Sequence, residues 1–279
     1  MERRVLGQTG EQLSILGFGG IIVSGLEQSE ADRIVAEAVD RGVNYFDVAP
    51  SYGNAEERLG PALEPYRKDV FLACKTAERT GDASAAELET SLKRLRTDHV
   101  DVYQMHGLSS MEDVETAFGP GGAIETFEAA KRDGKARFLG FSVHSVEAAL
   151  AALDRFQFDS VLFPVNFACW FGGFGPQIMD KAKAKGAGRL ALKSVARTFW
   201  PGEIRKHPKC WYEPYDDPEK AQLAFNWTLS QEITAAVSPG QHQLFPMMLD
   251  LAENFRPVTA ADEQRLREMA DGLTPIFPH

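Results

Sequence analysis

The sequence predicts a (β/α)8 barrel, and three observations support this fold class. At 279 residues the chain has the size of one such barrel, and 44% of its residues are apolar, which is enough for one sizeable core. Short apolar segments typical of buried strands alternate with segments whose apolar residues recur at helical spacing. Eight such units favour parallel strands that close on themselves, so we expect a single domain over residues 1–279.

The expected elements follow one another in regular order along the chain. A hairpin at residues 3–14, built around a Gly-bearing turn, is expected to close the barrel floor. Strands are expected at residues 15–20, 43–47, 70–75, 100–106, 137–142, 160–166, 189–193 and 233–237. Helices are expected from residue 55 onward and at residues 28–41, 84–95, 122–133, 145–154, 176–185, 217–231 and 259–272. Ser84 and Glu87 have the spacing of a capping box at a helix start.

An open, doubly wound parallel sheet is the alternative fold. That fold usually carries a Gly-x-Gly-x-x-Gly turn after its first strand to bind a dinucleotide. The first expected strand here ends in Gly19 and Gly20 without that pattern. We therefore prefer the closed barrel.

Composition excludes several classes of partner. A formal charge of −10 gives the chain no basic field for nucleic acid or for an anionic membrane surface. Its three cysteines are too few and too scattered for a disulfide framework, and no Cys-x-x-Cys pair suggests a metal site. No apolar run approaches the roughly 20 residues of a membrane span. We expect a cytoplasmic protein without bound metal, nucleic acid or membrane partner.

Four polar residues lie at or just beyond the ends of consecutive expected strands: Asp47, Tyr52, Lys75 and His106. The C-terminal ends of neighbouring barrel strands meet at one opening, where chemistry is usually built. A buried lysine beside an aspartate stays charged, and its charge lowers the pKa of a nearby tyrosine hydroxyl. We therefore expect Tyr52 to donate a proton while His106 orients a carbonyl oxygen or shares the acid role.

Each of these residues taken singly has a plainer explanation. A lysine at a strand end is more often solvated or structurally paired, and a lone histidine there is more often a satisfied structural residue. The ordered combination is far less common by accident. The aromatic segment 198–216 is either a loop over the barrel mouth that walls a substrate pocket or a surface loop packed on itself.

At this point the chain resembles the aldo-keto reductase family. Gly42-Val-Asn-Tyr-Phe-Asp47-Val-Ala-Pro-Ser-Tyr52-Gly-Asn-Ala-Glu56-Glu-Arg-Leu59-Gly60 is similar to a signature of that family. The opening Arg4-Val-Leu-Gly-Gln-Thr-Gly10 and Leu16-Gly-Phe-Gly-Gly20 match its hairpin and first strand. The resemblance covers most of the chain and is strong to about residue 145. It implies a barrel that uses NADPH, or less often NADH, to reduce aldehydes and ketones.

Carried over position by position, the resemblance implies a role for each member of the group. Tyr52 becomes the general acid, Lys75 and Asp47 tune it, and His106 orients the substrate carbonyl. The cofactor residues that it implies are Gly20, Asp47, Ser142, Asn166, Lys193, Ser194, Ser238, Gly240, Glu253 and Asn254.

The cofactor half departs from the family pattern at several positions. Val143 stands where an amide is expected, and Leu162 stands where a glutamine usually contacts the carboxamide. Residues 241–250 contain no Arg or Lys for an adenosine 2′-phosphate, with His242 as the one basic candidate. NADP(H) is ranked slightly ahead of NAD(H) on the resemblance alone.

Three functional hypotheses follow from these residues. The first is a nicotinamide-dependent oxidoreductase acting on a small carbonyl compound or its alcohol. The second is a reductase-like regulatory protein that senses a dinucleotide. The third is a barrel enzyme that uses the Tyr, Lys and His group for non-redox elimination or isomerisation.

Overall fold

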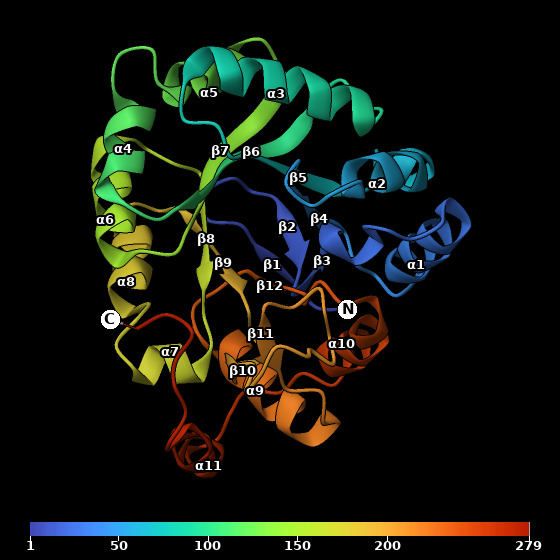
Figure 1. The fold of residues 1–279 in the computed structure, drawn as a ribbon, viewed down its shortest axis with the longest axis vertical. Coiled ribbons are helices and arrows are strands. Elements are labelled where there is room, and N and C mark those ends of the chain that lie inside the picture. Colours follow the sequence, from blue (N-terminus) through green and yellow to red (C-terminus); the bar gives the residue numbers. More distant parts are fainter. Residues whose placement is uncertain (279) are drawn as a thin grey trace.

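The computed structural model describes residues 1–278 and contains eight parallel strands that close into a barrel surrounded by helices (Figure 1). Each strand pairs with the next along the chain, and the last strand closes the ring between the first and the seventh. The barrel strands are β3 (Leu16–Gly19), β4 (Tyr45–Val48), β5 (Phe71–Thr76), β6 (Val100–Leu108), β7 (Ala136–Val143), β8 (Ser160–Pro164), β9 (Gly188–Leu192) and β12 (Ala235–Val237). The predicted fold class is confirmed.

The N-terminal hairpin is present and seals one end of the barrel. Strands β1 (Arg3–Val5) and β2 (Gln12–Ser14) pair antiparallel. Leu6 and Leu13 from this hairpin are fully buried in the cluster of apolar side chains that fills the barrel interior. The guanidinium of Arg4 donates to the carbonyls of Leu229 and Ile233, which precede β12. The hairpin is therefore held to the end of the barrel at which the strands begin.

Helices of the expected amphipathic kind cover the outside of the barrel. They bury their apolar stripe against the outward faces of the strands, which form the larger apolar cluster of the molecule. The helices anticipated by the sequence are α1 (Gln28–Asp40), α2 (Ala55–Leu63), α3 (Gly81–Arg94), α5 (Ala123–Arg132), α6 (Val146–Arg155), α8 (Pro176–Ala184), α9 (Pro218–Ser230) and α11 (Ala260–Ala270).

Several short elements were not anticipated. They are α4 (Met111–Phe118), α7 (Phe167–Phe171), α10 (Phe245–Glu253), the 3-10 turns η1 (Gly20–Val23), η2 (Glu64–Tyr66) and η3 (His242–Leu244), and the hairpin of β10 (Ala196–Phe199) with β11 (Tyr212–Pro214). These elements have between three and nine residues, too few for apolar positions to recur often enough for the sequence pattern to reveal them.

The capping box expected at Ser84 and Glu87 is wrong. Helix α3 begins three residues earlier, at Gly81. Ser84 lies inside the helix with its hydroxyl 3.4 Å from that of Tyr103, and the Glu87 carboxylate accepts a 2.6 Å bond from the Thr76 hydroxyl. Both side chains bond to neighbouring strands instead of capping the helix. Such contacts between distant segments cannot be recognised from a local sequence pattern.

Within the strands, alternate side chains point into the barrel. The lower interior is apolar and includes Tyr45 on β4, Leu162 on β8 and Leu190 on β9. Two positions after Tyr45 along β4, Asp47 lies deeply buried. The interior thus changes from apolar to polar toward the C-terminal ends of the strands. Among residues 1–278, no helix is both long and apolar enough to cross a membrane.

Candidate active site

A cavity of about 190 Å³ opens at the C-terminal ends of the barrel strands. Its lining combines the ends of several strands with the loops that follow them. The lining residues are Gly19, Ile21, Asp47, Tyr52, His106, His144, Leu192, Lys193, Lys209, Trp211, Tyr212, Val237, Ser238 and Gly240. This is the end of a barrel at which catalytic residues are usually found.

Asp47 and Lys75 form a buried ion pair under this cavity. Both side chains are almost fully excluded from solvent, and the Lys75 ammonium donates to the Asp47 carboxylate. The Tyr45 hydroxyl donates to the second Asp47 oxygen over 3.3 Å. Burial by itself lowers the pKa of Lys75, but the facing Asp47 carboxylate and Tyr52 outweigh it and raise the pKa. Lys75 therefore carries its charge at neutral pH.

Tyr52 lies in the loop after β4, directly above this ion pair. The Lys75 ammonium lies 5.2 Å from the centre of the Tyr52 ring. The sequence predicted a lowered pKa for the Tyr52 hydroxyl, and in the protein alone this direction is wrong. Burial raises the pKa of Tyr52 more than the Lys75 charge lowers it. The Lys75 charge lowers the pKa of Tyr52 as expected, but the loss of hydration on burial raises that pKa by more.

His106 lies near the end of β6 and completes the group. Its ring meets the Tyr52 ring edge to face, with 5.6 Å between the ring centres. Its Nδ1 is 3.3 Å from the Ser51 hydroxyl. Burial, reinforced by the positive charges of Lys75 and Arg79, lowers the pKa of His106 to about 3. The imidazole is therefore neutral at physiological pH and offers one N–H to a carbonyl oxygen. The structure brings all four residues of the predicted group to one end of the barrel.

Some residues assigned to the cofactor also line the cavity. Lys193 follows β9, and Ser238 and Gly240 follow β12. The Ser238 hydroxyl accepts a 3.0 Å bond from the Gly19 amide, which joins β12 to β3. At Gly240 a Cβ atom would lie 2.2 Å from the Ile21 side chain, so the turn approaches η1 more closely than any other residue allows.

Four further cofactor candidates are buried around the cavity without lining it. Gly20 opens η1, and the Ser142 hydroxyl accepts a 2.7 Å bond from the Gly107 amide. Asn166 caps α7 by accepting from the Cys169 amide, while its Nδ2 has no partner within residues 1–278. The Ser194 hydroxyl is likewise buried and unpaired in the described chain. Asn166 and Ser194 thus retain spare hydrogen-bonding capacity.

The structure does not bring Glu253 and Asn254 to this cavity. They lie at the C-terminal end of α10, where the Glu253 carboxylate pairs bidentately with Arg41 at 2.6 and 2.8 Å. Arg41 precedes β4, so this pair lies toward the floor of the barrel. Asn254 bonds back to the Asp250 carbonyl within its own helix. The adenine contact expected of these two residues stays a prediction.

Sequence reasoning assigned no site role to two polar cavity residues. His144 follows β7, and its Nε2 lies 3.1 Å from the Lys193 ammonium. Lys209 belongs to the loop before β11, and its ammonium donates to the carbonyls of Ile22 at 2.8 Å and Ser24 at 2.6 Å. The end of strand 137–142 pointed to the place of His144, whereas no local pattern distinguishes Lys209.

The aromatic loop 198–216 lies over the mouth of the barrel, as one of its two interpretations proposed. Trp211 and Tyr212 line the cavity. The Trp200 indole N–H bonds the Cys210 carbonyl at 2.8 Å, so the loop also packs on itself. Both interpretations therefore hold for different residues of one segment.

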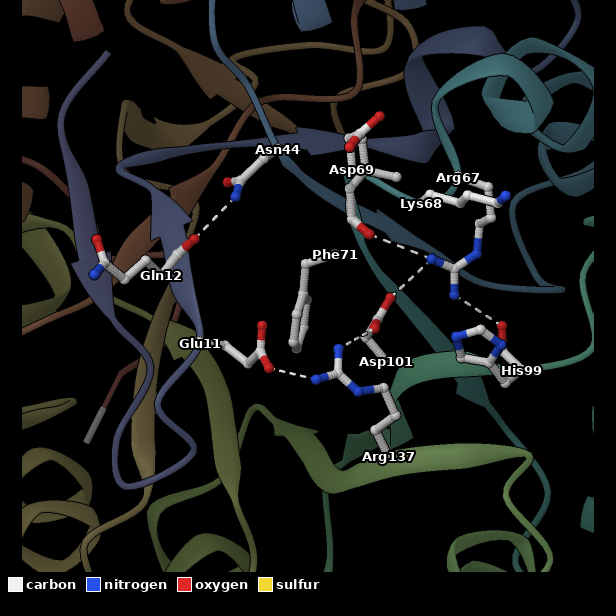
Figure 2. A pocket seen from close by; sticks show the side chains of 11 residues that line it. Glu11, Gln12, Asn44, Arg67, Lys68, Asp69, Phe71, His99, Asp101 and Arg137 are labelled. Carbon is white, nitrogen blue, oxygen red and sulfur yellow. Dashed lines mark hydrogen bonds and ion pairs between the residues drawn. The ribbon is translucent and has the colours of Figure 1, made fainter.

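A second, larger cavity of about 370 Å³ lies at the floor of the barrel (Figure 2). Asp101 is sandwiched there between Arg67 at 3.0 Å and Arg137 at 2.7 Å, and Arg137 also pairs with Glu11 of the hairpin turn. The Leu72 amide donates to the same Asp101 carboxylate at 2.8 Å. Because the two arginines and Asp101 are satisfied by one another, this network holds the hairpin to the strands. Stability is the usual role of this face.

Comparison with known proteins identifies the family. The model of the aldo/keto reductase family matches residues 15–268. The chain belongs to the aldo/keto reductase family.

Individual relatives agree with this membership. The uncharacterized oxidoreductase YqkF of Bacillus subtilis is 33% identical over 51% of this chain and 49% of its own length, so that match spans about half of each protein. L-galactose dehydrogenase of Arabidopsis thaliana is 29% identical over 99% of this chain and 95% of its own. The aldo-keto reductase AKR11C1 of Bacillus halodurans (holo form) superimposes with a TM-score of 0.78 at 23% identity, covering 99% and 98% of the two chains.

Members of the aldo/keto reductase family generally use a nicotinamide dinucleotide, and the residues present fit one in part. Asn166 and Ser194 offer unpaired buried polar atoms, and Lys193 and Lys209 supply positive charge beside the cavity. Leu162 is fully buried and offers no hydrogen bond to a carboxamide. At about 190 Å³ the cavity is smaller than the usual 300–1,000 Å³ of ligand sites, and Lys209 forms part of its wall.

Proposed function

We propose that this protein is an NAD(P)H-dependent reductase of small aldehydes or ketones, with Tyr52 as general acid, or in the reverse direction an NAD(P)+-dependent dehydrogenase of the corresponding alcohols. One observation carries the proposal. The buried Lys75 ammonium, held by Asp47, lies 5.2 Å from the ring centre of Tyr52, and Tyr52 lines the same cavity as His106. Family membership supports the reaction class, and in this proposal the four side chains carry out the proton transfer that accompanies hydride transfer.

Each residue has a defined task in this proposal. Tyr52 donates its phenolic proton to the carbonyl oxygen as that oxygen gains negative charge. The Lys75 ammonium stabilises the phenolate that remains, and Asp47 keeps the ammonium charged and oriented. The neutral His106 donates its N–H to the same carbonyl oxygen and fixes its position.

The nicotinamide supplies the hydride when it is bound, while the protein contributes alignment and electrostatics. We assign its contacts to Gly20, Asn166, Ser194, Ser238 and Gly240. Proximity of the two reactants inside a closed cavity accounts for much of the expected rate enhancement.

We propose NADP(H) as the cofactor, with NAD(H) as the competing choice. Two basic residues, Lys209 and His242, lie beside the Gly240 turn. The Lys209 amide donates to the Gln241 side chain at 3.2 Å, and the Lys209 ammonium adds to burial in lowering the pKa of His242. A 2′-phosphate beside these two groups gains a charge-assisted bond from the Lys209 ammonium that the 2′-hydroxyl of NAD(H) does not form. Equilibrium titration with both cofactors decides between them.

Replacement of Tyr52 by Phe tests the proposal directly. We expect Tyr52→Phe to lower kcat for aldehyde reduction by about 10²- to 10⁴-fold because the proton donor is removed. Cofactor affinity, followed by fluorescence titration, should stay within about twofold, since the phenyl ring preserves the packing. Tyr66→Phe, which alters a tyrosine of η2, is the matched control and should keep full activity.

The same measurements separate the alternatives. Unchanged turnover in Tyr52→Phe would remove Tyr52 from the acid role. Tight cofactor binding by the wild-type protein, with no oxidation of the cofactor across a broad aldehyde panel, would favour a dinucleotide sensor. Absence of binding to either cofactor would favour non-redox chemistry.

A further inference from the structure

Lys193 occupies an unusual backbone position at the edge of the active-site cavity. It directly follows β9 with a φ of 61°, in the left-handed region that non-glycine residues rarely adopt. Such a conformation is unfavourable for a non-glycine residue and persists where the surrounding structure enforces it, often at functional sites. This backbone turn directs the lysine side chain into the cavity.

Within residues 1–278, the Lys193 ammonium has polar and aromatic neighbours and forms no ion pair. Within residues 1–278 its hydrogen-bond partner is the His144 Nε2, at 3.1 Å. It lies 5.2 Å from the centre of the Phe277 ring and 5.6 Å from that of Trp211, so its walls are aromatic. His144 is itself stacked on Phe277, with 4.9 Å between ring centres, and this stacking fixes the acceptor nitrogen. The ammonium is therefore held in place without being neutralised.

The other ionisable groups around Lys193 do not supply the missing negative charge. Lys75 on β5 is a cation already paired with Asp47, and burial keeps both His106 and His144 neutral. Cys169 of α7 is a thiol whose pKa burial raises. Burial lowers the pKa of Lys193 to about 7, and the Lys75 charge adds to this effect. Below pH 7 the Lys193 side chain is therefore mostly cationic, and no carboxylate of residues 1–278 pairs with it.

We propose that Lys193, positioned by His144, forms an oxyanion subsite that binds the carboxylate of the carbonyl substrate. The preferred substrates are then aldehydes or ketones that also carry a carboxylate. This inference rests on the proposed function and narrows its substrate class. The carboxylate would bond the ammonium while the carbonyl faces Tyr52 and His106 across the same cavity.

The direction of the side chain favours the substrate over the cofactor diphosphate, which offers the same oxyanion chemistry. Lys193 follows β9, and its ammonium reaches past the end of β8 to a histidine that follows β7. The Ser238–Gly240 turn assigned to the cofactor follows β12, on the opposite side of β9. The ammonium thus points away from that turn and toward Phe277 near the C-terminal end of the chain.

The test compares succinic semialdehyde, which carries a carboxylate, with butanal, which has the same chain length and no charge. For Lys193→Met we expect KM for succinic semialdehyde to rise about 10- to 100-fold, the usual effect of losing a charge-assisted bond. KM for butanal should change less than about threefold. Lys193→Arg should retain most of the wild-type preference for succinic semialdehyde over butanal. Lys183→Met, which removes an exposed lysine paired with Glu232, is the matched control.

The pH dependence of this discrimination gives a readout that a merely structural role would not change. In the wild-type protein the preference for succinic semialdehyde should fall as the pH rises through about 7, because the Lys193 ammonium loses its proton there. Lys193→Arg should keep the preference up to pH 9, since a guanidinium remains charged. Lys193→Met should show little preference at any pH.

Equilibrium binding keeps this proposal separate from the proposed function. Benzoate and benzamide are titrated against the protein at pH 6 while the tryptophan fluorescence, to which Trp211 contributes, is recorded. Binding of benzoate but not benzamide, lost in Lys193→Met, supports the subsite even if no aldehyde is turned over. Equal effects of Lys193→Met on both aldehydes, or weaker NADPH and NADH binding with unchanged discrimination, would overturn the substrate assignment, and the latter would place the oxyanion on the cofactor.

Discussion

At the scale of single residues, the site depends on an ion pair that is costly to bury. Asp47 and Lys75 are both about 1% exposed, and each charge loses its hydration in this position. Their contact and the Tyr45 hydroxyl bond offset that loss. The pair is tolerated because it places a permanent positive charge beneath Tyr52. Replacing the whole pair with apolar residues need not destabilise the fold, whereas removing one partner does.

Lys75→Met therefore leaves the Asp47 carboxylate buried without a counterion. We expect a loss of about 3–5 kcal/mol in the free energy of unfolding, measured by urea denaturation. Adding Asp47→Asn to this variant removes the orphaned charge and keeps an acceptor for Tyr45, so most of the stability should return. A single variant as stable as the wild type, or a double variant no better than the single one, would contradict this account of the pair.

At the scale of elements, short helices around the cavity are fixed by individual caps. Helix α7 has only five residues, and isolated helices of that length are not stable in water. The Asn166 side chain accepts from the Cys169 amide at 2.9 Å and sets the start of α7. The same residue keeps its Nδ2 free for the cofactor in our proposal. The two functions of Asn166 are therefore separable by substitution.

We expect Asn166→Ala to lower the free energy of unfolding by about 1 kcal/mol, because the cap is lost. Asn166→Ser retains a capping oxygen but no amide and should recover part of this stability. If Nδ2 contacts the cofactor, NADPH and NADH binding should be weakened in both variants, and by the same factor in Asn166→Ala as in Asn166→Ser. Cofactor affinity that follows stability across the two variants, or that does not change at all, would reduce Asn166 to a structural cap.

At the scale of the whole molecule, Lys209 joins two parts of the barrel mouth that are far apart in the sequence. Its ammonium donates to the carbonyls of Ile22 and Ser24 and lies 3.4 Å from that of Ile21. These contacts hold the loop that precedes β11 over η1 and narrow the cavity. Because the cavity is smaller than a dinucleotide requires, opening of this contact is the motion that we expect during cofactor exchange.

Lys209→Met removes the donor and leaves a side chain of similar length. We expect hydrogen exchange of the amides in residues 200–212 to become about tenfold faster, because local opening costs less free energy. Cofactor dissociation, followed by stopped-flow fluorescence, should accelerate as well, with little change in Tm. Lys206→Met, in the same loop but paired with Asp216, is the control. Unchanged exchange in the loop would show that other contacts hold it closed.

Features that depend on neighbouring residues can be predicted from the sequence, whereas features that depend on contacts between distant segments appear only in the structure. Hydrophobic periodicity is a local property, so the hairpin, the barrel strands and most helices could be predicted from the chain alone. The elements missed are short ones such as α7, where a cap rather than a period sets the structure. The ion pair of Glu253 with Arg41 joins two distant segments, so no local pattern in the sequence predicts it.

The sequence by itself determined the barrel and the positions of Asp47, Tyr52, Lys75 and His106, since the C-terminal ends of parallel strands necessarily share one rim. Only the tertiary structure decided which side chains of the site are charged and which are neutral. Burial keeps His106 neutral and raises the pKa of Tyr52, and the contacts of Lys193 come from segments far away in the chain. Hydration and charge pairing depend on which segments meet in space, and residue order alone does not specify those contacts.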